Sequence, residues 1–356
     1  MLLSPLNWGA GHATRDIPVI NMLLEKGCRV FVACSGELQN ILSSKIEGIT
    51  FVRLPEMHIK YNRRMPLWLK LLIQIPSFIK VVYAEYRAVK KLVSQYSLDA
   101  IISDNRYGVR HKSVCSVIIT HQLHIETPGM LSPFSYLANR INRFFISRFD
   151  MCWIPDEAPP NHLSGKLSNP EHIKIPFQYT GILSRFTAFP QKEERQVLVM
   201  VSGPEPQRTV FRELVFNQAL KTTGRVIIVA SNATTRIVKH AVGRIEIINS
   251  PKQDQLNKLI LQSKYIVARA GYSSIMELVS LKKQAILVPT PGQPEQEYLA
   301  RWMTKYGFVH IPQHELNLDE DILRIRSYLP EKEQWPEPQN AKLSDCIDDV
   351  IANSKT

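Results

Sequence analysis

The stretch 265–300, YIVARAGYSSIMELVSLKKQAILVPTPGQPEQEYLA, contains the pattern that decides the fold. An apolar strand pattern is followed by a turn at Gly271, a helical pattern, a second apolar strand pattern and the start of another helix. Strands that alternate with helices in this way form parallel sheets, because the helix carries the chain back to the edge where the strand began. Ligands of such sheets bind beyond the carboxyl ends of the strands. We therefore expect the turns that follow the strands to form the binding site.

The same alternation continues toward both ends of the chain, and a length of 356 residues exceeds the size at which one core usually stops growing. The predicted strands are 2–6, 29–33, 100–103, 114–120, 196–201, 225–230, 246–248, 265–268 and 284–289. The predicted helices are 17–26, 83–95, 208–221, 255–262 and 343–352. The sequence therefore predicts an α/β protein with two Rossmann-like, doubly wound lobes that face each other across one cleft.

A charged segment separates the two lobes. Residues 186–195 contain Pro190 and the cluster QKEER, which is typical of an exposed linker. We predict a first lobe at 1–186, a linker at 187–195, a second lobe at 196–330, and a tail with a final helix at 331–356. The first strand has nothing upstream of it, which fits a start that is slightly truncated.

The composition favours a phosphorylated small-molecule partner. Lys and Arg number 44 against 32 Asp and Glu, so the formal net charge is +12, and an excess of positive charge favours anionic partners. No basic tract is interleaved with aromatic residues, and no zinc-finger spacing occurs, so we expect no nucleic-acid partner. The five cysteines form no CxxC pair, and the start carries no secretory leader pattern. We therefore expect a cytoplasmic protein.

The stretch 65–83, MPLWLKLLIQIPSFIKVVY, has two interpretations. It mixes apolar residues with Lys70 and Lys80, which is typical of a basic amphipathic segment lying in a membrane interface. Alternatively it is a helix that faces the protein core and is interrupted at Pro76. No run in the chain reaches the roughly 18 uninterrupted apolar residues of a membrane span, so we expect at most a peripheral contact with the inner face of the cell membrane.

The first turn of the chain is rich in glycine and carries a histidine. In PLNWGAGHATRDIPVINMLL, residues 5–24, Gly9 and Gly11 allow a close approach of the backbone, and the helix that follows can hold an anion at its N-terminus. His12 is a candidate general base or hydrogen-bond donor, and Arg15 is a candidate phosphate ligand. The alternatives are a histidine that packs the turn and a solvated arginine. The third glycine of the dinucleotide fingerprint is missing, which argues against NAD.

The turn at Gly271 offers a second anion site. Ser273 and Ser274 can cap the helix that follows, and the exposed amides there suit a diphosphate. Glu277 lies three residues after Ser274, which is the spacing of a capping box, so its alternative role is to fix the start of the helix.

Two further loops of the second half are candidates for the same site. The loop after the strand at 284–289 carries amide and carboxylate groups, which suit the hydroxyls of a sugar, namely Gln293, Gln296 and Glu297. The loop after the strand at 196–201 carries groups that suit a phosphate, namely Ser202, Gly203 and Arg208.

Residues 269–300 resemble the C-terminal signature of family 28 glycosyltransferases, the group that contains the N-acetylglucosaminyltransferase of peptidoglycan lipid intermediates. The resemblance implies a GT-B fold, with the acceptor in the first lobe and the nucleotide-sugar donor in the second. It implies that Glu277 binds the ribose of a uridine nucleotide and that Ser273 and Ser274 face the diphosphate. It assigns the remaining donor contacts to Gln296 and Glu297 for the sugar, Ser202 for a phosphate, and Ile247 and Ile248 for the base. The family has two adjacent glutamines where this chain has Gln296 and Glu297.

The turn GAGHATR also resembles the GxGHxxR turn of UDP-sugar hydrolases in nonulosonic-acid biosynthesis. The segments AIISDNRYG, 100–108, and THQLHIETP, 120–128, have a similar layout to that group. This second resemblance adds four candidates for the cleft, namely Asp104, Tyr107, His121 and His124. Their alternative roles are a turn cap for Asp104 and hydrogen-bonded structure for the histidines.

Together these features predict an enzyme that transfers a hexose or an N-acetylhexosamine from a UDP-sugar to an unknown acceptor with inversion. His12 or Asp104 is expected to deprotonate the acceptor. If the acceptor is lipid-linked, the stretch 65–83 would have a role in docking. No cofactor and no metal are expected, because no DxD-like pair is placed to hold one and fixed amides can stabilise the leaving diphosphate. The alternatives are a UDP-sugar hydrolase that uses water as the acceptor and a nucleotide-sugar-binding protein without turnover.

Overall fold

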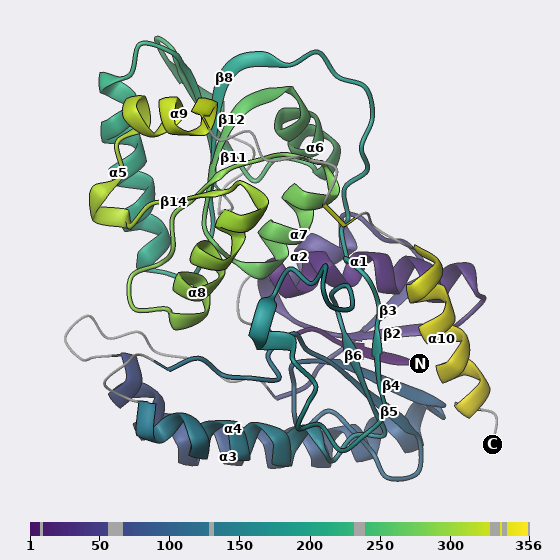
Figure 1. Ribbon diagram of the computed structural model, residues 1–356. Coiled ribbons are helices and arrows are strands. Elements are labelled where there is room, and N and C mark those ends of the chain that lie inside the picture. The colour runs from purple at the N-terminus through teal and green to yellow at the C-terminus, as the bar shows by residue number, and fades with distance from the viewer. Residues whose placement is uncertain are drawn as a thin grey trace. The chain divides into compact units, whose positions relative to one another are not determined.

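The computed structural model describes residues 1–7, 10–55, 67–127, 132–230, 239–327, 335–336 and 340–354. Gly9, one of the two glycines predicted to shape the first turn, lies outside the described residues, as do 65 and 66. The chain forms two compact units, Met1–Leu183 together with Pro338–Thr356, and Ser184–Glu337. Each unit has its own parallel sheet with helices between the strands (Figure 1).

The first unit is a seven-stranded sheet in the order β3-β2-β1-β4-β5-β6-β7. All of its neighbouring strands pair in parallel. Its elements are β1 (Leu2–Ser4), α1 (Ala10–Glu25), β2 (Val30–Ala33), α2 (Gly36–Ser43), β3 (Ile49–Val52), α3 (Leu67–Tyr96), β4 (Ala100–Asp104), β5 (Cys115–Ile119), α4 (Ser132–Ile146), β6 (Met151–Ile154), the 3-10 helix η2 (Gly165–Ser168), β7 (Phe177–Tyr179) and α10 (Asn340–Ser354).

The strand order of this sheet reverses between β1 and β4. The two strands lie side by side with Ser4 opposite Ser103. Every residue of both is buried, which explains why each strand begins with an apolar run, LL in β1 and AII in β4. A reversal of this kind opens a crevice beyond the carboxyl ends of the two strands. The turn after β1 and the last residue of β4 therefore meet at the position that α/β proteins use for ligands.

Helix α3 runs without a break through Pro76, so the predicted interruption there is wrong. A proline removes one hydrogen bond and bends a helix, but it does not end one whose later turns are held by packing. The later part of α3 is held in this way, because Val89 is fully buried and Leu92 and Val93 pack around it. Among the described residues, no helix is long and apolar enough to cross a membrane.

The second unit is a seven-stranded sheet in the order β10-β11-β9-β8-β12-β13-β14. Its strands are parallel except at the β10–β11 pair. Its elements are β8 (Glu194–Val201), α5 (Gln207–Lys221), β9 (Arg225–Ala230), β10 (Lys239–Val242), β11 (Ile245–Asn249), α6 (Gln253–Gln262), β12 (Ser263–Ala268), α7 (Tyr272–Ser280), β13 (Ile286–Leu287), α8 (Pro294–Trp302), the 3-10 helix η3 (Met303–Tyr306), β14 (Val309–His310), the 3-10 helix η4 (Gln313–Glu315) and α9 (Leu318–Ser327).

The order of the second sheet reverses between β8 and β12. The loop after β8 begins at Ser202, and the turn after β12 contains Gly271. The two turns predicted to hold phosphates therefore follow the two strands that flank the reversal. This is the position at which open α/β sheets bind nucleotides.

The predicted linker at 187–195 is bonded to the second unit. The side-chain amide of Asn257 on α6 donates to the carbonyl oxygen of Thr187 at 3.0 Å, and Lys283 pairs with Glu193 at 2.9 Å. Strand β8 already begins at Glu194. The segment thus makes contacts to the second unit, although Lys192, Glu193 and Glu194 remain exposed.

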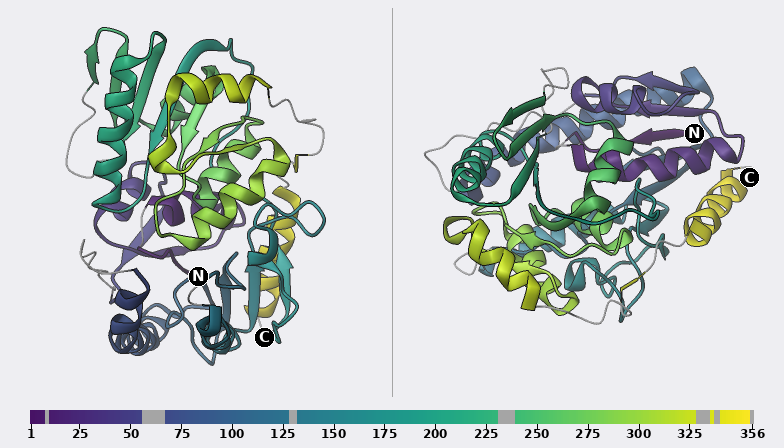
Figure 2. Two further views of the ribbon diagram at one scale, coloured as in Figure 1. Left: turned by 60° about the vertical axis from the view of Figure 1, so that its left-hand side comes forward. Right: turned by 90° about the horizontal axis from the view of Figure 1, so that it is seen from above.

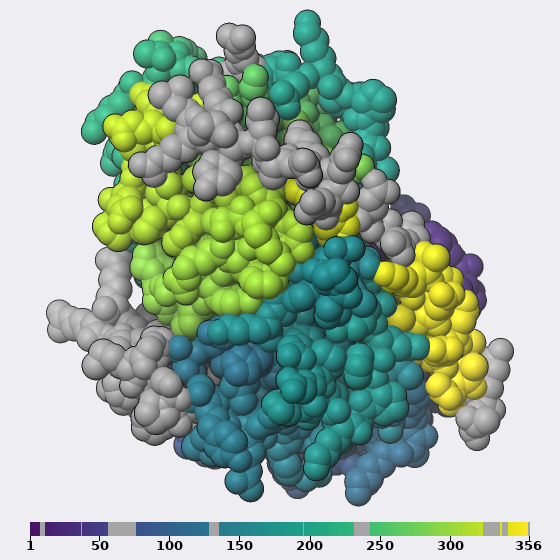
Figure 3. All heavy atoms as spheres, in the orientation of Figure 1, coloured from purple at the N-terminus to yellow at the C-terminus, as the bar shows by residue number. Residues whose placement is uncertain are grey.

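The last helix, α10, belongs to the first unit. Leu343, Ile347 and Val350 on one of its faces are buried, and Lys26 at the end of α1 pairs with Asp348 at 2.7 Å. The right panel of Figure 2 shows α10 in yellow beside α1 in purple, and Figure 3 shows α10 lying on the surface of this unit. The chain therefore returns to the first unit after completing the second.

Candidate functional site

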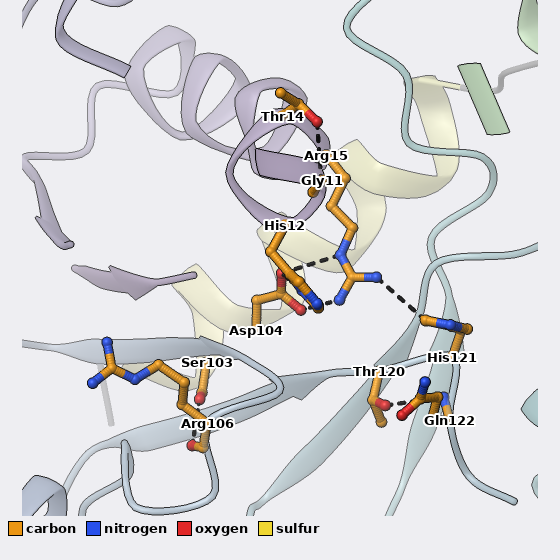
Figure 4. Close-up of polar contacts among 10 residues, drawn as sticks. All are labelled: Gly11, His12, Thr14, Arg15, Ser103, Asp104, Arg106, Thr120, His121 and Gln122. Atoms are coloured by element: carbon orange, nitrogen blue, oxygen red, sulfur yellow. Dashed lines mark hydrogen bonds and ion pairs between the residues drawn. The ribbon is translucent and has the colours of Figure 1, made fainter. Parts of the chain in front are cut away.

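The carboxyl ends of β1 and β4 bring His12 and Asp104 together. His12 lies in the first turn of α1, and Asp104 is the last residue of β4. The imidazole Nδ1 is 2.8 Å from the carboxylate Oδ2 (Figure 4). The His12 side chain is 18% exposed and the Asp104 side chain is 0% exposed. A substrate can therefore reach the imidazole, whereas it cannot reach the carboxylate.

Arg15, one turn after His12, fixes the same carboxylate. Its Nε donates to Oδ2 of Asp104 at 3.1 Å, and its second terminal nitrogen pairs with Oδ1. Burial alone would raise the pKa of Asp104, but the charge of Arg15, the charge of His12 and the hydrogen bonds from both lower it to about 2. Asp104 is therefore an ionised carboxylate throughout the neutral range.

This arrangement determines what each group can do chemically. An ionised carboxylate only accepts hydrogen bonds, so the proton of a neutral His12 is assigned to Nδ1 and the lone pair to Nε2. A histidine held in this way by a buried carboxylate can take a proton at Nε2, as in Ser-His-Asp triads. Asp104 is suited to orient the imidazole, not to take the proton from a substrate itself.

Arg15 also reaches His121, which follows β5. Its NH1 lies 3.3 Å from Nδ1 of His121, and both side chains are buried (Figure 4). The network of four side chains thus joins the ends of β1, β4 and β5. Asp16 lies beside it on α1, fully buried, and burial together with the nearby charge of Asp104 raises its pKa well above the usual range.

Tyr107 and His124, two other candidates, point elsewhere. The Tyr107 hydroxyl donates to Oδ1 of Asn142 on α4 at 2.6 Å, and its ring packs against Phe78 and Phe145. His124 is close to Glu126, with 3.5 Å between Nε2 and Oε1, and its side chain is 45% exposed. The turn after Asp104 carries Tyr107 into the core beneath α4, so Tyr107 contributes packing.

In the second unit, α7 begins directly after Gly271, and this N-cap residue provides no side-chain cap. Ser273 and Ser274 therefore lie inside the first turn, and the prediction that they cap the helix is wrong. The capping-box alternative for Glu277 is wrong for the same reason, because that box requires a helix that starts after Ser274. Glu277 instead accepts a hydrogen bond from Nε of Arg185 at 2.8 Å, and both side chains are largely buried.

Arg185 is a residue of this site that the sequence did not reveal. It lies in the segment that precedes β8, and its carbonyl oxygen accepts a hydrogen bond from the Gln253 side chain at 2.8 Å. Its guanidinium carbon lies 4.6 Å from the centre of the Phe186 ring. No motif marks such an arginine, because its partner Glu277 is distant in sequence.

Two of the predicted sugar ligands, Gln296 and Glu297 in α8, hold the loop between β13 and α8. Oε1 of Gln296 accepts the backbone N–H of Thr290 at 2.8 Å, and Oε1 of Glu297 accepts that of Gly292 at 3.2 Å. Gln293 is the residue that precedes α8. These side chains therefore shape the loop, and their contact with a sugar stays a prediction.

The loop after β8 has the backbone of a tight turn. Gly203, next to Ser202, has φ +104°, a conformation that only glycine adopts readily. Arg208 is paired with Glu205, with 2.9 Å between Nε and Oε1. Ile248, predicted to line a base pocket, is buried, whereas its neighbour Ile247 is partly buried and packs against the apolar core of the second unit.

Comparisons with known proteins agree with this architecture. Residues 217–349 match the model of the glycosyltransferase family 28 C-terminal domain. A comparison with curated protein sequences finds no match.

Solved structures with this fold include three glycosyltransferases. The calicheamicin glycosyltransferase CalG4 is 11% identical with a TM-score of 0.67, covering 99% of this chain and 98% of that chain. UGT89C1 of Arabidopsis thaliana, complexed with UDP-L-rhamnose, is 13% identical with a TM-score of 0.62, covering 100% and 98%. The spinosyn rhamnosyltransferase SpnG, complexed with thymidine diphosphate, is 13% identical with a TM-score of 0.58, covering 99% and 92%.

At these identities the likeness concerns the fold, and it confirms the predicted GT-B class with two doubly wound α/β domains. The domain match and the fold together support glycosyl transfer as the general activity.

Proposed function

We propose that this chain transfers a hexose or an N-acetylhexosamine from a UDP-sugar to a hydroxyl group of an acceptor, with inversion at the anomeric carbon. The observation that carries the proposal is the pair of His12 and Asp104, fixed by Arg15 at the end of β1 and β4. The family 28 match over 217–349 supports a donor site in the second unit. Neighbours of the same fold hold UDP-L-rhamnose or thymidine diphosphate, which supports a pyrimidine nucleotide.

The proposed reaction is one direct displacement. Nε2 of His12 takes the proton of the acceptor hydroxyl as its oxygen attacks the anomeric carbon. The bond from that carbon to the diphosphate oxygen breaks on the opposite side, and UDP leaves. The negative charge of the Asp104 carboxylate, which is hydrogen-bonded to Nδ1, stabilises the imidazolium formed in this step. Attack opposite the leaving group inverts the configuration at the anomeric carbon.

The donor site is proposed at the turns after β8 and β12. The first turn of α7 presents its backbone N–H groups and the hydroxyls of Ser273 and Ser274 to the diphosphate, because a helix N-terminus without a cap favours an anion. Glu277, oriented by Arg185, is proposed to bind the ribose. Gln296 and Glu297 are proposed to bind the sugar, and no metal or other cofactor takes part.

Nucleotide binding tests this site. We expect UDP to raise the melting temperature of the purified protein more than GDP, ADP, TDP or CMP does. A ligand at a hundredfold excess over its Kd stabilises the folded state by about 2.7 kcal/mol. In Glu277→Gln, which keeps the shape of the side chain but loses its charge, we expect most of the UDP-induced shift to be lost.

The matched control is Glu193→Gln, which alters an exposed carboxylate paired with Lys283 on the same unit. It should keep the full UDP-induced shift. If no nucleotide shifts the melting temperature of the wild-type protein, the donor assignment is wrong. UDP release from UDP-sugars, measured with and without a membrane extract as acceptor source, then separates a transferase from a hydrolase, and no release from any UDP-sugar would indicate a binding protein.

The surface of α3 and α4 supports the further proposal that the acceptor is lipid-linked and lies at the cytoplasmic face of the cell membrane. The helices contact each other through Phe78 and Phe145, whose ring centres are 5.8 Å apart. Six large apolar side chains on them are 40–68% exposed, namely Ile79, Tyr83, Tyr136, Leu137, Ile141 and Phe144. The exposed charged side chains on the described parts of the two helices are basic and include Lys80, Arg87, Lys90, Lys91 and Arg140.

Among the described side chains of α3 and α4, the one carboxylate is Glu85, which is buried against Arg106. Apolar side chains surrounded by uncompensated positive charge suit the interface of an anionic bilayer. We therefore propose a peripheral membrane contact through this surface.

Vesicle flotation tests the contact. We expect the protein to float with vesicles that contain phosphatidylglycerol and to remain behind with phosphatidylcholine alone. The double variant Tyr136→Ser/Phe144→Ser should bind the anionic vesicles about tenfold more weakly or worse, because each fully buried apolar side chain contributes about 1.5–3 kcal/mol. Leu220→Ser, at an apolar residue of α5 that is 53% exposed, is the control. Unchanged binding by the double variant would rule out this surface.

A further inference from the structure

The carboxyl end of β12 carries an arginine, Arg269, that pairs with no carboxylate among the described residues. Arg269 directly follows the strand, and it is 1% exposed. Its hydrogen bonds all go to neutral oxygens, namely the carbonyls of Val288 at 3.3 Å, Pro289 at 3.2 Å and Gln207 at 3.4 Å, and the side-chain carbonyl of Gln313 at 2.7 Å. The guanidinium carbon lies 3.9 Å from the centre of the Phe211 ring.

This environment is unusual for a buried charge. Burial lowers the pKa of Arg269 to about 10, so the side chain is still charged at neutral pH. Its Nε has no hydrogen-bond partner in the described part of the chain. Buried charges are normally paired, because removing an ion from water is costly unless an opposite charge replaces the solvent. Within the described part of the chain, Arg269 thus carries a positive charge without a counter-ion.

The surroundings of Arg269 add positive potential. Three residues later α7 begins, with Gly271 as its N-cap and no acidic residue in its first turn, and the N-terminus of a helix carries a partial positive charge. The nearby start of α5 does have a carboxylate, but Glu205 is already bound there by Arg208 and Thr209. The turn after β12 therefore combines a full and a partial positive charge.

We infer that Arg269 is a positioning residue for a nucleoside diphosphate, whose negative charge is its missing counter-ion. The inference rests on the donor site proposed above and adds a residue to it. Arg269 keeps its contacts to the four neutral oxygens and acts on the diphosphate through space. Because its charge is already fixed and desolvated, nothing has to reorganise when negative charge grows on the departing diphosphate.

The most direct test introduces a carboxylate beside Arg269, so that the protein itself provides the counter-ion. In Gln313→Glu a carboxylate replaces the amide that Arg269 already contacts at 2.7 Å, and the guanidinium keeps its position. We expect the melting temperature without ligand to rise. We also expect UDP to bind about tenfold more weakly or worse while uridine binds within about twofold of the wild-type value, because a nearby carboxylate repels and replaces the diphosphate charge.

Isothermal titration calorimetry with UDP and with uridine measures both affinities. Gln191→Glu, which adds one negative charge elsewhere in the same unit and keeps the hydrogen bond from Gln262, is the control and should bind UDP as the wild-type protein does. Two variants at the residue itself complete the set. Arg269→Gln should lose the preference for UDP over uridine, and Arg269→Lys should restore most of it.

The outcomes separate this inference from the function on which it rests. A wild-type protein that binds no UDP refutes the proposed donor site. If the wild-type protein binds UDP and Gln313→Glu binds it equally well, the inference about Arg269 is overturned and the donor site stands. Equal losses for UDP and uridine would also overturn the inference, since they indicate a structural role for the contact.

Discussion

His12→Ala is expected to lower kcat by about 10²- to 10⁴-fold, the range that a general base contributes. The imidazole is the basic group that Asp104 and Arg15 hold in a single orientation, and it is partly exposed whereas its carboxylate partner is fully buried. UDP binding should be unchanged, because the donor is bound by the second unit in this proposal. The measurement is the initial rate of UDP release from a UDP-sugar with saturating acceptor, together with calorimetric binding of UDP.

His124→Ala provides the matched control within the same unit. Its imidazole contacts Glu126 and lies outside the network of Arg15, so the rate should stay within about twofold, as for other surface positions. A His12→Ala protein that keeps more than a tenth of the wild-type rate would show that the base is another group.

Asp104→Asn is expected to reduce kcat by a similar factor, for a different reason. An asparagine can donate a hydrogen bond to Nδ1 of His12, so the imidazole proton moves to Nε2 and the lone pair that would accept the substrate proton is lost. In Ser-His-Asp triads the same change of tautomer lowers kcat by about 10⁴-fold. The variant should also be less stable by about 3–5 kcal/mol, because it leaves the buried guanidinium of Arg15 without its counter-ion. Urea unfolding at fixed pH measures the loss.

A double variant separates the two effects of this substitution. Arg15→Gln/Asp104→Asn removes both charges, so it should regain much of the lost stability and none of the lost activity. Recovery of activity together with stability would show that Asp104 has only a structural role.

The stability that Asp104 contributes should also depend on pH in a defined direction. Its folded pKa of about 2 lies below the ordinary value for an aspartate, which is about 3.9. The contribution is therefore complete above the ordinary value and is lost as the pH falls toward 2. In Asp104→Asn this part of the acid unfolding curve should be absent.

The sequence predicted the central strands of both sheets well and the peripheral ones poorly. Strands such as β1, β4 and β12 are buried along most of their length, so each contains an apolar run, namely LL, AII and YIVA. The strands β3, β6, β7, β10 and β14 were missed. β7 and β14 lie at sheet edges, and β7 is the short segment FQY with an exposed Phe177. Segments of two to four residues carry too little periodicity to be distinguished from a loop.

The candidate site shows the same limit. His12 and Arg15 were predicted from their turn, and Asp104 and His121 from the resemblance to UDP-sugar hydrolases. His12 and Asp104 were rival bases in the sequence and are partners in the structure. Their pairing depends on β1 lying beside β4. The order of strands in a sheet cannot be predicted from the local sequence pattern of each strand. The pairing of Arg185 with Glu277 was missed because it depends on the path of the segment before β8, which carries no motif.

The attachment of α10 to the first unit has a consequence for the order in which the chain is made. Domains generally fold as units as they leave the ribosome, the N-terminal one first. Here the first unit must wait, because the helix that contributes Leu343, Ile347 and Val350 to its buried surface is translated only after the whole second unit. Until then the apolar surface that α10 will cover stays open to water, to chaperones and to other nascent chains. The unit that is synthesised first is thus the one that is completed last.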